Sequence, residues 1–497
     1  MTSAWLPWAV LASSLLPGLV IFALPEHRRG WRTSLNLAGA AGKLVLVALL
    51  LEGASRLQVA ESRIAVLPGL DFVLRADALG LLFLTLSALL WAVTTVYAVG
   101  YLEDSPHRSR FFGFFSLCVF ATAGIALAGN LFTLLVFYEI LTLVTYPLVI
   151  HRGTAAALAA GRRYLMYTLP SGALLLAAVA GLHGLAGPQD FVSGGYLAPF
   201  AAGHRAGLLL LFAALMAGFG VKAALVPLHG WLPSAMVAPA PVSALLHAVA
   251  VVKAGAFAIL RVVYEVYGVE FAASLGVLAP LAAIAGFTIV YGSVRALFQH
   301  EIKKRLAYST VSQVAYIVLG TAVLGMLSTV GALVHLVHQG LMKITLFFSA
   351  GNYAETLGVH HVEDMDGIGR RMPLTTAAFT VGALGMIGVP PVAGFVSKLY
   401  LGAGAAEAGQ WWVLAVLATS SLLNAMYFLP LLHRAWFRPA RGPWAGDDGR
   451  NRDARAMLLV PTLLTALFSL GVGLFAATPW SPLDWVRLIT RLEYGDG

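Results

Sequence analysis

Residues 218–241, GFGVKAALVPLHGWLPSAMVAPAP, interrupt an apolar segment at the depth where a membrane-spanning helix should continue. Pro227 and Pro233 each lack the backbone N–H that an interior helical residue donates, so a regular helix cannot run through them. Unpaired backbone groups at membrane depth are tolerated only inside protein or beside water. The stretch therefore predicts a broken helix next to a polar or hydrated interior.

Residues 385–404, GMIGVPPVAGFVSKLYLGAG, repeat this pattern in a second span. Pro390 and Pro391 again remove helix hydrogen bonds, and Gly394 follows them. Discontinuous helices of this kind form ion sites in membrane transporters. Proline and glycine are also generally frequent in membrane helices, which would explain either break alone. Two breaks of the same kind favour a functional role.

The rest of the chain is as apolar as these two stretches. It has 497 residues, of which 59% are hydrophobic and 11% charged, and its mean hydropathy is +0.82. A typical soluble domain has about 25% charged residues, so the composition excludes a soluble protein. Because a spanning helix takes about 20 residues, no soluble domain of ordinary size fits between the expected spans. The sequence indicates an all-α polytopic membrane protein.

Apolar windows bounded by glycine, proline or charged residues predict about 14 transmembrane helices. The two interrupted segments are helices 7 and 12 of this series. The expected spans are residues 3–25, 34–52, 78–101, 111–128, 130–150, 164–185, 206–227, 241–263, 272–297, 307–326, 328–353, 374–404, 411–436 and 457–478.

The two broken helices lie five spans apart, and an odd spacing gives the two units opposite orientations. Helices 4–8 and 9–13 are therefore predicted to form two inverted five-helix repeats. The predicted division is helices 1–3 at 1–105, the first repeat at 106–265, the second repeat at 266–437, and helix 14 with a short tail at 438–497.

Most of the loop lysines and arginines follow odd-numbered spans, as at Arg28, Arg29 and residues 303–305. The net charge of +9 therefore reflects basic residues gathered in the loops on one side of the membrane, and it does not indicate a nucleic-acid partner. The positive-inside rule places these loops in the cytoplasm. We expect a multi-pass protein of the plasma (inner) membrane with both termini non-cytoplasmic. The first span has no basic region before it, so we expect it to be retained.

The placement of lysine is the sharpest signal in the sequence. Five of the seven lysines fall within predicted spans, namely Lys43, Lys222, Lys253, Lys343 and Lys398. A lysine at the centre of a membrane helix costs about 2.5–3.5 kcal/mol on insertion scales, so chance does not readily place five there. Lys43 lies in the outer half of its span and is expected to snorkel toward the interface. The others predict an ionisable pathway, with structural ties between helices as the alternative.

Glu139 is the one carboxylate that the sequence places deep within an apolar segment, NLFTLLVFYEILTLVTYPLVI. Desolvation favours the neutral form of such a group, whereas a facing lysine favours its charged form. Lys222, in the same proposed repeat, is the natural partner. The pair is predicted to hold or release a proton according to the distance between its members. A static ion pair that fixes helix register is the alternative.

The eleventh span carries a polar stripe. At about 100° per residue, His335, Gln339 and Lys343 fall within an arc of about 80°, with His338 about 60° to the other side. Imidazole is the side chain that titrates nearest to neutral pH. His338 beside Lys343 is therefore predicted to relay protons, and His335 and Gln339 are possible members of that relay.

His247 is a further possible relay residue in the eighth span. On a regular helix it points about 120° away from Lys253, so the two can face one neighbour only if the helix is distorted. Ser309 and Gln313 in the tenth span add polar groups that could hold water.

No motif for a nucleotide, flavin, haem, iron–sulfur cluster or metal is recognisable, so no cofactor is expected. His360 and His361, beside Glu363, resemble a metal ligand set only in composition and are predicted to be a solvated loop. The single cysteine, Cys118, cannot form an internal disulfide.

Four strings resemble one family, the antiporter-like membrane subunits shared by respiratory complex I, Mrp-type sodium/proton antiporters and membrane-bound hydrogenases. The strings are KAALVPLHGWLPSAMVAPAPVSALLHAVAVVKAG, KKRLAYSTVSQVAYI, HLVHQGLMKITLFFSAGN and GVPPVAGFVSKLYL. The resemblance runs from about residue 77 to 434. It implies fourteen helices with two inverted five-helix repeats and a line of ionisable groups across the middle of the membrane.

Within that resemblance, matching strings assign the family's ionisable positions to residues already noted. They are Glu139, Lys222, Lys253, Lys343 with His338 nearby, and Lys398. The chain is similar in length to the shorter members and resembles the Mrp D-type subunit most, although PVSALLHAVAVV is nearer to the largest complex I subunit. Gln339 stands where some members have a second histidine, so a two-imidazole relay is not implied.

We interpret the chain as a non-catalytic, proton-translocating subunit of an Mrp-type or complex I-related assembly. Its expected partners are other antiporter-like and small membrane subunits, the lipid bilayer, protons and a monovalent cation. Three alternatives stay open: a membrane subunit of a proton-pumping NADH/quinone oxidoreductase or hydrogenase, a self-sufficient cation transporter, and a structural subunit. The five lysines within the predicted spans argue against a purely structural subunit.

Overall fold

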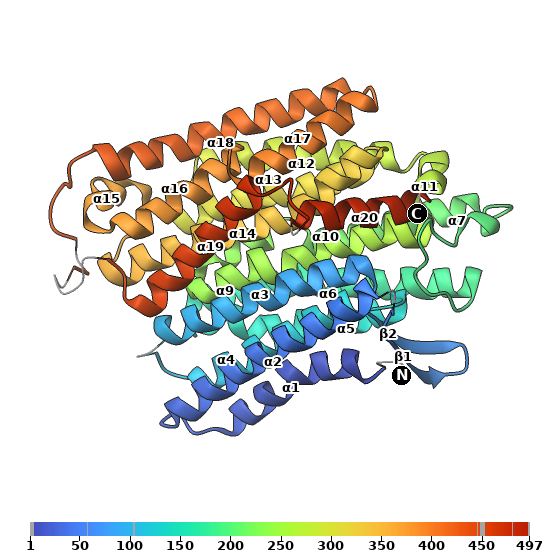
Figure 1. The fold of residues 1–497 in the computed structure, drawn as a ribbon, viewed down its shortest axis with the longest axis horizontal. Helices are drawn as coiled ribbons and strands as arrows, with labels where there is room; N and C mark the ends of the chain where they lie inside the picture. Colours follow the sequence, from blue (N-terminus) through green and yellow to red (C-terminus); the bar gives the residue numbers. More distant parts are fainter. Residues whose placement is uncertain are drawn as a thin grey trace.

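A computed structural model describes residues 4–56, 58–102, 105–444, 446–447, 453–479 and 481–495. Long helices run side by side in one direction and form a bundle (Figure 1). Within the described residues, 12 helices are long and apolar enough to cross a membrane. The chain is therefore a multi-span helical membrane protein, as the composition predicts.

The N-terminal part of the bundle is built from six long helices and one hairpin. The helices are α1 (Trp5–Ala23), α2 (Arg29–Ser55), α3 (Ala78–Tyr101), α4 (Arg108–Ala126), α5 (Leu131–Val149) and α6 (Ala155–Ala186). Strands β1 (Glu61–Leu67) and β2 (Leu70–Arg75) pair antiparallel between α2 and α3.

The middle of the chain is more broken. Its elements are η1 (Ala198–Phe200), α7 (Arg205–Lys222), α8 (Trp231–Ser234), η2 (Ala235–Val237), α9 (Ala240–Ala244), the π-helical segment η3 (Leu245–Val249), α10 (Val251–Arg261), the π-helical segment η4 (Val262–Tyr267) and α11 (Val269–Leu275).

The C-terminal part again consists mainly of long helices. They are α12 (Leu278–Leu297), α13 (Ile302–Ala322), α14 (Met326–Leu357), α16 (Pro373–Ile387), α17 (Ala393–Glu407), α18 (Trp411–Phe437), α19 (Ala456–Leu474) and the amphipathic α20 (Pro482–Tyr494), with the short η5 (Val362–Met365) and α15 (Ile368–Arg371) between α14 and α16.

Several helices begin at a residue whose side chain caps the free backbone N–H groups of the first turn. The carboxylate of Asp77 accepts from the N–H of Gly80 at 2.7 Å at the start of α3. Asn130 caps α5 through the N–H of Thr133 at 2.8 Å. These polar residues begin two of the candidate membrane spans.

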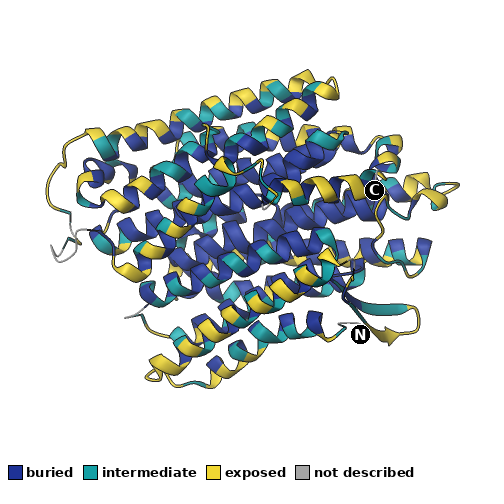
Figure 2. Cartoon of the chain, in the orientation of Figure 1, coloured by how far each residue is buried: buried dark blue, intermediate teal, exposed yellow. Residues whose placement is uncertain are grey.

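Helix α14 forms the axis of the bundle. It packs against α13, α16, α17, α19 and α20, and the apolar part of this helix is completely buried. Figure 2 shows buried residues filling the centre and exposed residues on outer helices such as α1, α2 and α18. Those outer helices expose leucines and other large apolar side chains, including Val45 and Leu422. Such a surface suits contact with lipid.

Helices form in all fourteen predicted windows, and the two predicted breaks are present. Helix α7 ends at Lys222, and five residues separate the end of α16 from the start of α17. Helix α13 and the α16–α17 pair are not among the 12 candidate spans, so the count of fourteen and the inverted repeats stay predictions. The hairpin and α20 were not predicted. Both ends of the chain lie at the same end of the bundle (Figure 1).

Candidate functional site

The predicted ionisable residues lie on five elements of the bundle. Glu139 is on α5, Lys222 on α7, Lys253 on α10, Lys343 on α14 and Lys398 on α17. The three lysines of α7, α10 and α14 are completely buried, whereas Glu139 and Lys398 are half-buried.

Lys222 lies at the first helix break, where it is the last residue of α7. Its Nζ donates a hydrogen bond to the main-chain oxygen of Tyr138 and lies 3.3 Å from the centre of that residue's ring. A helix C-terminus carries partial negative charge, which favours a cation at this position. An ammonium group is therefore stabilised here by the C-terminal end of α7 and by the carbonyl and ring of Tyr138 on α5.

Glu139 follows Tyr138 directly but makes no direct ion pair with Lys222 in the described structure. Its carboxylate packs on α6, where a Cβ at Gly172 would meet one oxygen at 2.6 Å. Its Oε1 is buried and has no hydrogen-bond partner within the described residues. Glu139 and Lys222 still interact electrostatically. The structure thus brings the predicted pair into one region without joining the two charges.

The helix that carries His247 and Lys253 is distorted. His247 lies in the π-helical segment η3, and Ala250 departs from helical geometry with φ −116° and ψ −84° before α10 begins. The His247 ring is 4.5 Å from the ring of Phe347, and Lys253 Nζ donates to the main-chain oxygen of Leu336 at 2.6 Å. Both partners belong to α14. The distortion lets both side chains face this one helix.

His335 occupies a central position among the basic groups. Its Nδ1 is 2.8 Å from Ser397 Oγ on α17. It interacts electrostatically with both Lys253 and Lys398. His335 therefore lies between the lysine of α10 and the lysine of α17, a placement that the sequence did not single out.

His338 and Gln339 also point into the buried interior from α14. Neither ring nitrogen of His338 and neither polar atom of the Gln339 amide has a hydrogen-bond partner within the described part of the chain. Buried polar groups normally have partners, including ordered water. Unpaired groups here fit a hydrated interior better than a dry core.

Lys343 contacts α13. Its Nζ donates to Ser309 Oγ at 2.6 Å and to the main-chain oxygen of Leu306 at 3.2 Å. The hydroxyl of Tyr427 on α18 also donates to Ser309 Oγ, at 3.0 Å. Two buried hydroxyl groups, those of Ser309 and Tyr427, thus connect Lys343 to α18.

Lys398 lies at the second helix break. Its Nζ donates to the main-chain oxygens of Met386 and Ile387 at 2.9 and 2.8 Å, and to Ser421 Oγ at 3.0 Å. The two carbonyls are the last of α16, which have no partner within their own helix. Lys398 therefore satisfies carbonyl groups that the break leaves free.

The predicted helix-breaking residues lie at or next to these two sites. Pro227 lies in the irregular stretch after α7, and Pro233 is part of the short α8. Pro390 and Pro391 separate α16 from α17. A Cβ at Gly394 would overlap the main-chain oxygen of Gly385, so the close approach of α17 to α16 requires glycine there.

The four interior lysines of α7, α10, α14 and α17 share one type of partner. Each donates to a main-chain carbonyl of another helix or of the break, and none has a carboxylate within ion-pair distance in the described chain. A carbonyl accepts a hydrogen bond from a neutral amine as well as from an ammonium. These contacts therefore do not fix the charge of the lysines.

The expectation that Lys43 snorkels is wrong. The side chain is completely buried, its Nζ donates to Ser14 Oγ at 2.9 Å, and it lies 5.4 Å from the Trp91 ring. These partners come from α1 and α3, and the sequence of α2 alone cannot show that they are in reach.

A buried carboxylate was also missed. Glu265, in η4, is 5% exposed and pairs with Arg261. The predicted span stopped at residue 263, two residues short of it. The i,i+4 spacing of arginine and glutamate was the available signal for this pair.

The histidines at 360 and 361 are exposed, as expected for a solvated loop. Within the described residues, no group of three or more histidine, cysteine, aspartate or glutamate side chains is arranged to hold a metal ion.

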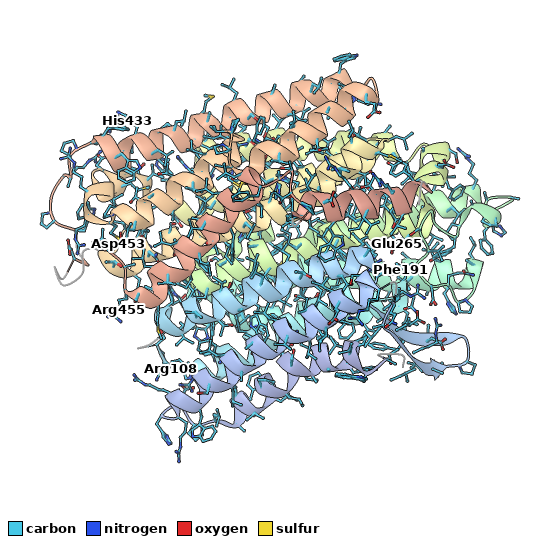
Figure 3. The ribbon with its side chains drawn as sticks, viewed as in Figure 1. Arg108, Phe191, Glu265, His433, Asp453 and Arg455 are labelled. Atoms are coloured by element: carbon cyan, nitrogen blue, oxygen red, sulfur yellow. The ribbon has the colours of Figure 1, made fainter. Side chains whose placement is uncertain are left out.

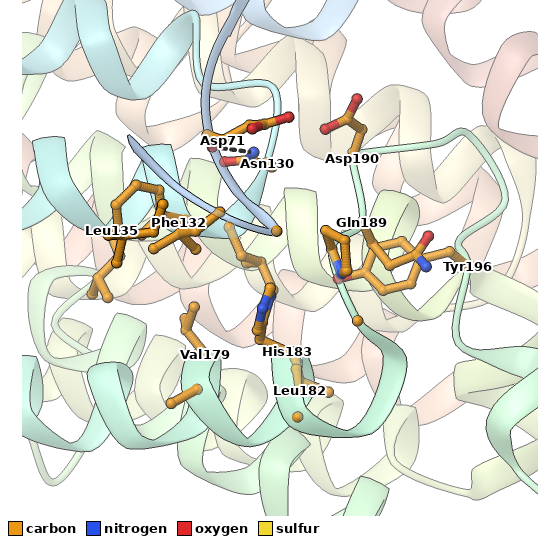
Figure 4. Close-up of a pocket in the computed structure, with 18 of the residues that line it drawn as sticks. Asp71, Asn130, Phe132, Leu135, Val179, Leu182, His183, Gln189, Asp190 and Tyr196 are labelled. Carbon is orange, nitrogen blue, oxygen red and sulfur yellow. Dashed lines mark hydrogen bonds between the residues drawn. The ribbon is translucent and has the colours of Figure 1, made fainter. Parts of the chain in front are cut away.

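A cavity of about 660 Å³ lies apart from the lysines, between the hairpin, the start of α5 and the end of α6. Figure 4 shows apolar side chains such as Leu135 and Val179 on one side and Asp71, Asn130 and Asp190 on the other. This cavity contains none of the predicted site residues.

A protein-family model described as NADH:quinone oxidoreductase/Mrp antiporter, TM, matches residues 128–424. The NADH-quinone oxidoreductase subunit N of Desulforudis audaxviator is 37% identical over 422 residues, which cover 82% of each chain. The D-type subunit of the Na(+)/H(+) antiporter of Bacillus subtilis is 28% identical over 82% of this chain and 81% of its own.

Two solved structures have the same fold. One chain in the Mrp complex from a Dietzia species superimposes with a TM-score of 0.87 at 24% identity, covering 100% of this chain and 98% of its own. One chain in the respiratory complex I from Thermus thermophilus gives a TM-score of 0.73 at 25% identity, covering 94% of this chain and 97% of its own.

Proposed function

The chain belongs to the NADH:quinone oxidoreductase/Mrp antiporter transmembrane family, and we propose that it carries protons across the membrane through its buried lysines. It is an antiporter-like membrane subunit of the kind found in Mrp and complex I assemblies. The resemblance read from the four sequence strings is thereby confirmed.

The observation that carries the proposal is the shared hydrogen bonding of the four interior lysines. An ion pair with a carboxylate would hold an ammonium in its charged form. Carbonyl partners accept a hydrogen bond from either form, so each lysine can gain or lose a proton without losing its contact. This arrangement suits a group whose charge must change, and it does not suit a static tie between helices.

The proposed route joins two sets of electrostatic contacts, and the step from Lys222 on α7 to Lys253 on α10 is inferred from the packing of these two helices. Glu139 is coupled to Lys222, and Lys253 interacts with Lys343 and with His335. His335 also interacts with Lys398. Protonation of one group disfavours the charged form of the next lysine, because like charges in a low-dielectric interior repel strongly. A proton arriving at one end of the row can therefore displace a proton further along it.

Three further polar residues are proposed to hold water or a proton between the lysines, namely His338, Gln339 and His247. Their ring nitrogens and amide atoms have no hydrogen-bond partner in the described structure, which leaves them available to hydrogen-bond water. Water at these positions would bridge distances that are too long for direct transfer.

The helix breaks give the route its polar surroundings. Lys222 is the last residue of α7, and Lys398 Nζ donates to the last two carbonyls of α16. In transporters, such ends of broken helices contact the transported cation or proton. We extend this role to the segments containing Pro227 and Pro233, and Pro390, Pro391 and Gly394.

We further propose that the protein works in the plasma (inner) membrane with both termini non-cytoplasmic, and that a monovalent cation moves in exchange for protons. Other membrane subunits are the natural partners, because the similar solved chains belong to multisubunit complexes. A subunit of a redox-driven proton pump is the second candidate, favoured by the 37% identity to an NADH-quinone oxidoreductase subunit.

Reconstitution tests the proposal directly. The intact assembly, placed in vesicles with an imposed sodium gradient, is expected to move protons, and the chain alone is expected not to. Robust exchange by the single chain would contradict the subunit role and would favour a self-sufficient transporter. Proton movement that depends only on an added electron donor and acceptor would favour the redox pump.

A further inference from the structure

A second buried charged cluster lies away from the lysines and has no part in the route described above. Arg261, at the end of α10, is completely buried. Its Nη2 donates to Asp77 Oδ1 at 2.8 Å, and its Nη1 donates to both carboxylate oxygens of Glu265. Figure 3 labels Glu265 at the end of the bundle opposite to Asp453 and Arg455. Both chain termini lie at the end that holds Glu265 (Figure 1).

Helix α20 brings a third carboxylate to this cluster. Glu493 is 6% exposed and interacts electrostatically with Arg261, Asp77 and Glu265. Its Oε1 accepts a hydrogen bond from Ser193 Oγ at 3.3 Å. Its Oε2 is buried and has no partner among the described residues. A buried acceptor without a partner indicates that a hydrogen atom or a water molecule belongs there.

The charges of the cluster do not balance. Three carboxylates, those of Asp77, Glu265 and Glu493, surround the single guanidinium of Arg261. Glu265 and Glu493 are both buried, and two carboxylates that share a buried site do not both ionise, so one of them retains a proton. In the described chain the cluster does not have the arrangement of a metal site, and one retained proton reduces the excess of negative charge by one.

The charged groups next to this cluster are already paired with each other. Arg63 and Arg75 of the hairpin bind Glu61 and Asp190. Arg75 also donates to the main-chain oxygen of Phe191 at 3.0 Å, and the ring of Phe191 lies 5.2 Å from the Arg261 guanidinium carbon.

The remaining neighbours are neutral hydroxyl groups. Tyr494, next to Glu493, bonds Thr329 on α14 at 3.0 Å, and Tyr264 bonds the same threonine at 3.1 Å. These groups add no positive charge to offset the two carboxylates that exceed the single guanidinium.

The cluster connects to solvent on one side and to the lysine row on the other. A surface cavity of about 200 Å³ is lined by Glu493 together with Ser193, Glu270 and Tyr494. This volume holds several water molecules at about 30 Å³ each. On the inner side, Lys253 is eight residues before Arg261 on α10, which is about 12 Å along a helix.

We propose that Glu265 and Glu493 share one proton beside the Arg261–Asp77 pair, and that this site passes protons between the Lys253 end of the route and water through Glu493. In the outward step the O–H bond of the Glu493 carboxylic acid breaks, a water molecule takes the proton as hydronium, and the carboxylate remains. The cluster regains its proton, through intervening water, from the ammonium of Lys253, which becomes a neutral amine. The transport half of this inference rests on the proposed function, whereas the shared proton does not.

Infrared difference spectra of the purified assembly at pH 7 test the shared proton. The C=O stretch of a protonated carboxylic acid is compared between the unaltered protein, Glu265→Gln and Glu493→Gln. Each substitution leaves two carboxylates for one guanidinium, so both are expected to remove the same protonated-acid band. Glu270→Gln is the matched control, because Glu270 is exposed and lines the same cavity. An unchanged band in Glu493→Gln overturns the proposal.

Proton flux in vesicles tests the passage through Glu493. Glu493→Gln is expected to reduce flux per assembled complex by roughly tenfold or more, the scale of a lost acid–base group. Glu270→Gln is expected to leave flux unchanged. Loss of the infrared band with normal flux overturns the exit role. A failure of the proposed function would instead show as normal flux in Glu139→Gln, a different variant.

Discussion

Lys222 Nζ binds the main-chain oxygen of Tyr138 and lies 3.3 Å from the centre of its ring, while Glu139, the next residue, turns toward α6. One turn of α5 thus presents a carbonyl and an aromatic face to the lysine and holds the carboxylate apart from it. A cation over an aromatic face is stabilised by about 0.5–2 kcal/mol. The ring therefore stabilises the ammonium form of Lys222, but less strongly than a direct ion pair with a carboxylate would.

The ring of Tyr138 is expected to matter more than its hydroxyl group. Tyr138→Phe keeps the ring and the main-chain carbonyl, so proton flux per assembled complex should stay near normal. Tyr138→Leu removes the aromatic face and should lower flux roughly threefold to tenfold, as a change of about 1 kcal/mol would. Equal flux in the two variants would show that the ring does not act on Lys222.

His335 is expected to be the more important of the two α14 histidines. It lies between Lys253 and Lys398 and its Nδ1 is 2.8 Å from Ser397 Oγ, whereas His338 interacts with Lys253 and with the main chain at Ala393. His335→Gln should reduce flux by roughly tenfold or more, and His338→Gln should reduce it less. Flux in vesicles, normalised to complex yield, is the measurement. A larger loss of flux in His338→Gln would instead support the relay role that the sequence predicts for His338.

Sequence patterns predicted the interior lysines well, because a lysine in an apolar segment is conspicuous wherever it points. They predicted partners poorly. The carbonyls of Tyr138, Leu336 and Met386 that receive the amines belong to other parts of the chain, and any residue type could supply them. For the same reason, the burial of Lys43 could not be read from α2 alone.

The elements that were missed have equally specific causes. Strands β1 and β2 are short and lie between two long spans, so their alternation is weak beside the helical signal. The distortion around His247 arises where α9 and η3 pack on α14, which is a tertiary effect. Glu265 was overlooked because the predicted span ended at residue 263, although its i,i+4 partner Arg261 lies within that span.

The orientation of the chain can be tested with reporter fusions. The C-terminal end of α20 and the connection between α18 and α19 lie at opposite ends of the bundle (Figure 1). A reporter after residue 497 is expected to be non-cytoplasmic, and a reporter near Asp447 is expected to be cytoplasmic, because arginines gather in that connection. If both reporters are cytoplasmic, the number of crossings between them is wrong.

His151, in the turn after α5, gives a prediction for stability and pH. Burial, with a smaller contribution from nearby Arg110, lowers the pKa of His151 from its usual value near 6.5 to about 4. The folded protein therefore prefers the neutral ring. This preference stabilises the fold fully above about pH 6.5 and is lost progressively as the pH falls toward 4. By linkage, the contribution is about 3 kcal/mol.

Thermal unfolding of the purified assembly at pH 7 and pH 5 checks this expectation. The unaltered protein should lose stability between the two values, and His151→Gln should lose less. His433→Gln, at an exposed position on α18, should behave like the unaltered protein. An equal loss of stability in His151→Gln would contradict the role given to the buried ring.

The last prediction concerns Glu139 and Lys222, which interact without forming a direct ion pair. Because they are coupled, we expect them to titrate as a pair. Glu139→Gln keeps the shape and hydrogen-bonding capacity of the side chain, so the complex should assemble in normal yield. Proton flux should fall by roughly a hundredfold or more, since a neutral amide cannot accept the proton. Lys222→Ala should fail in the same way, with some added loss of packing from its methylene groups.

A static tie between helices would give the opposite order of damage, with poor assembly first and near-normal flux in the complex that survives. Measuring complex yield and flux for each variant separates the two, and normal flux per complex in Glu139→Gln would remove Glu139 from the mechanism.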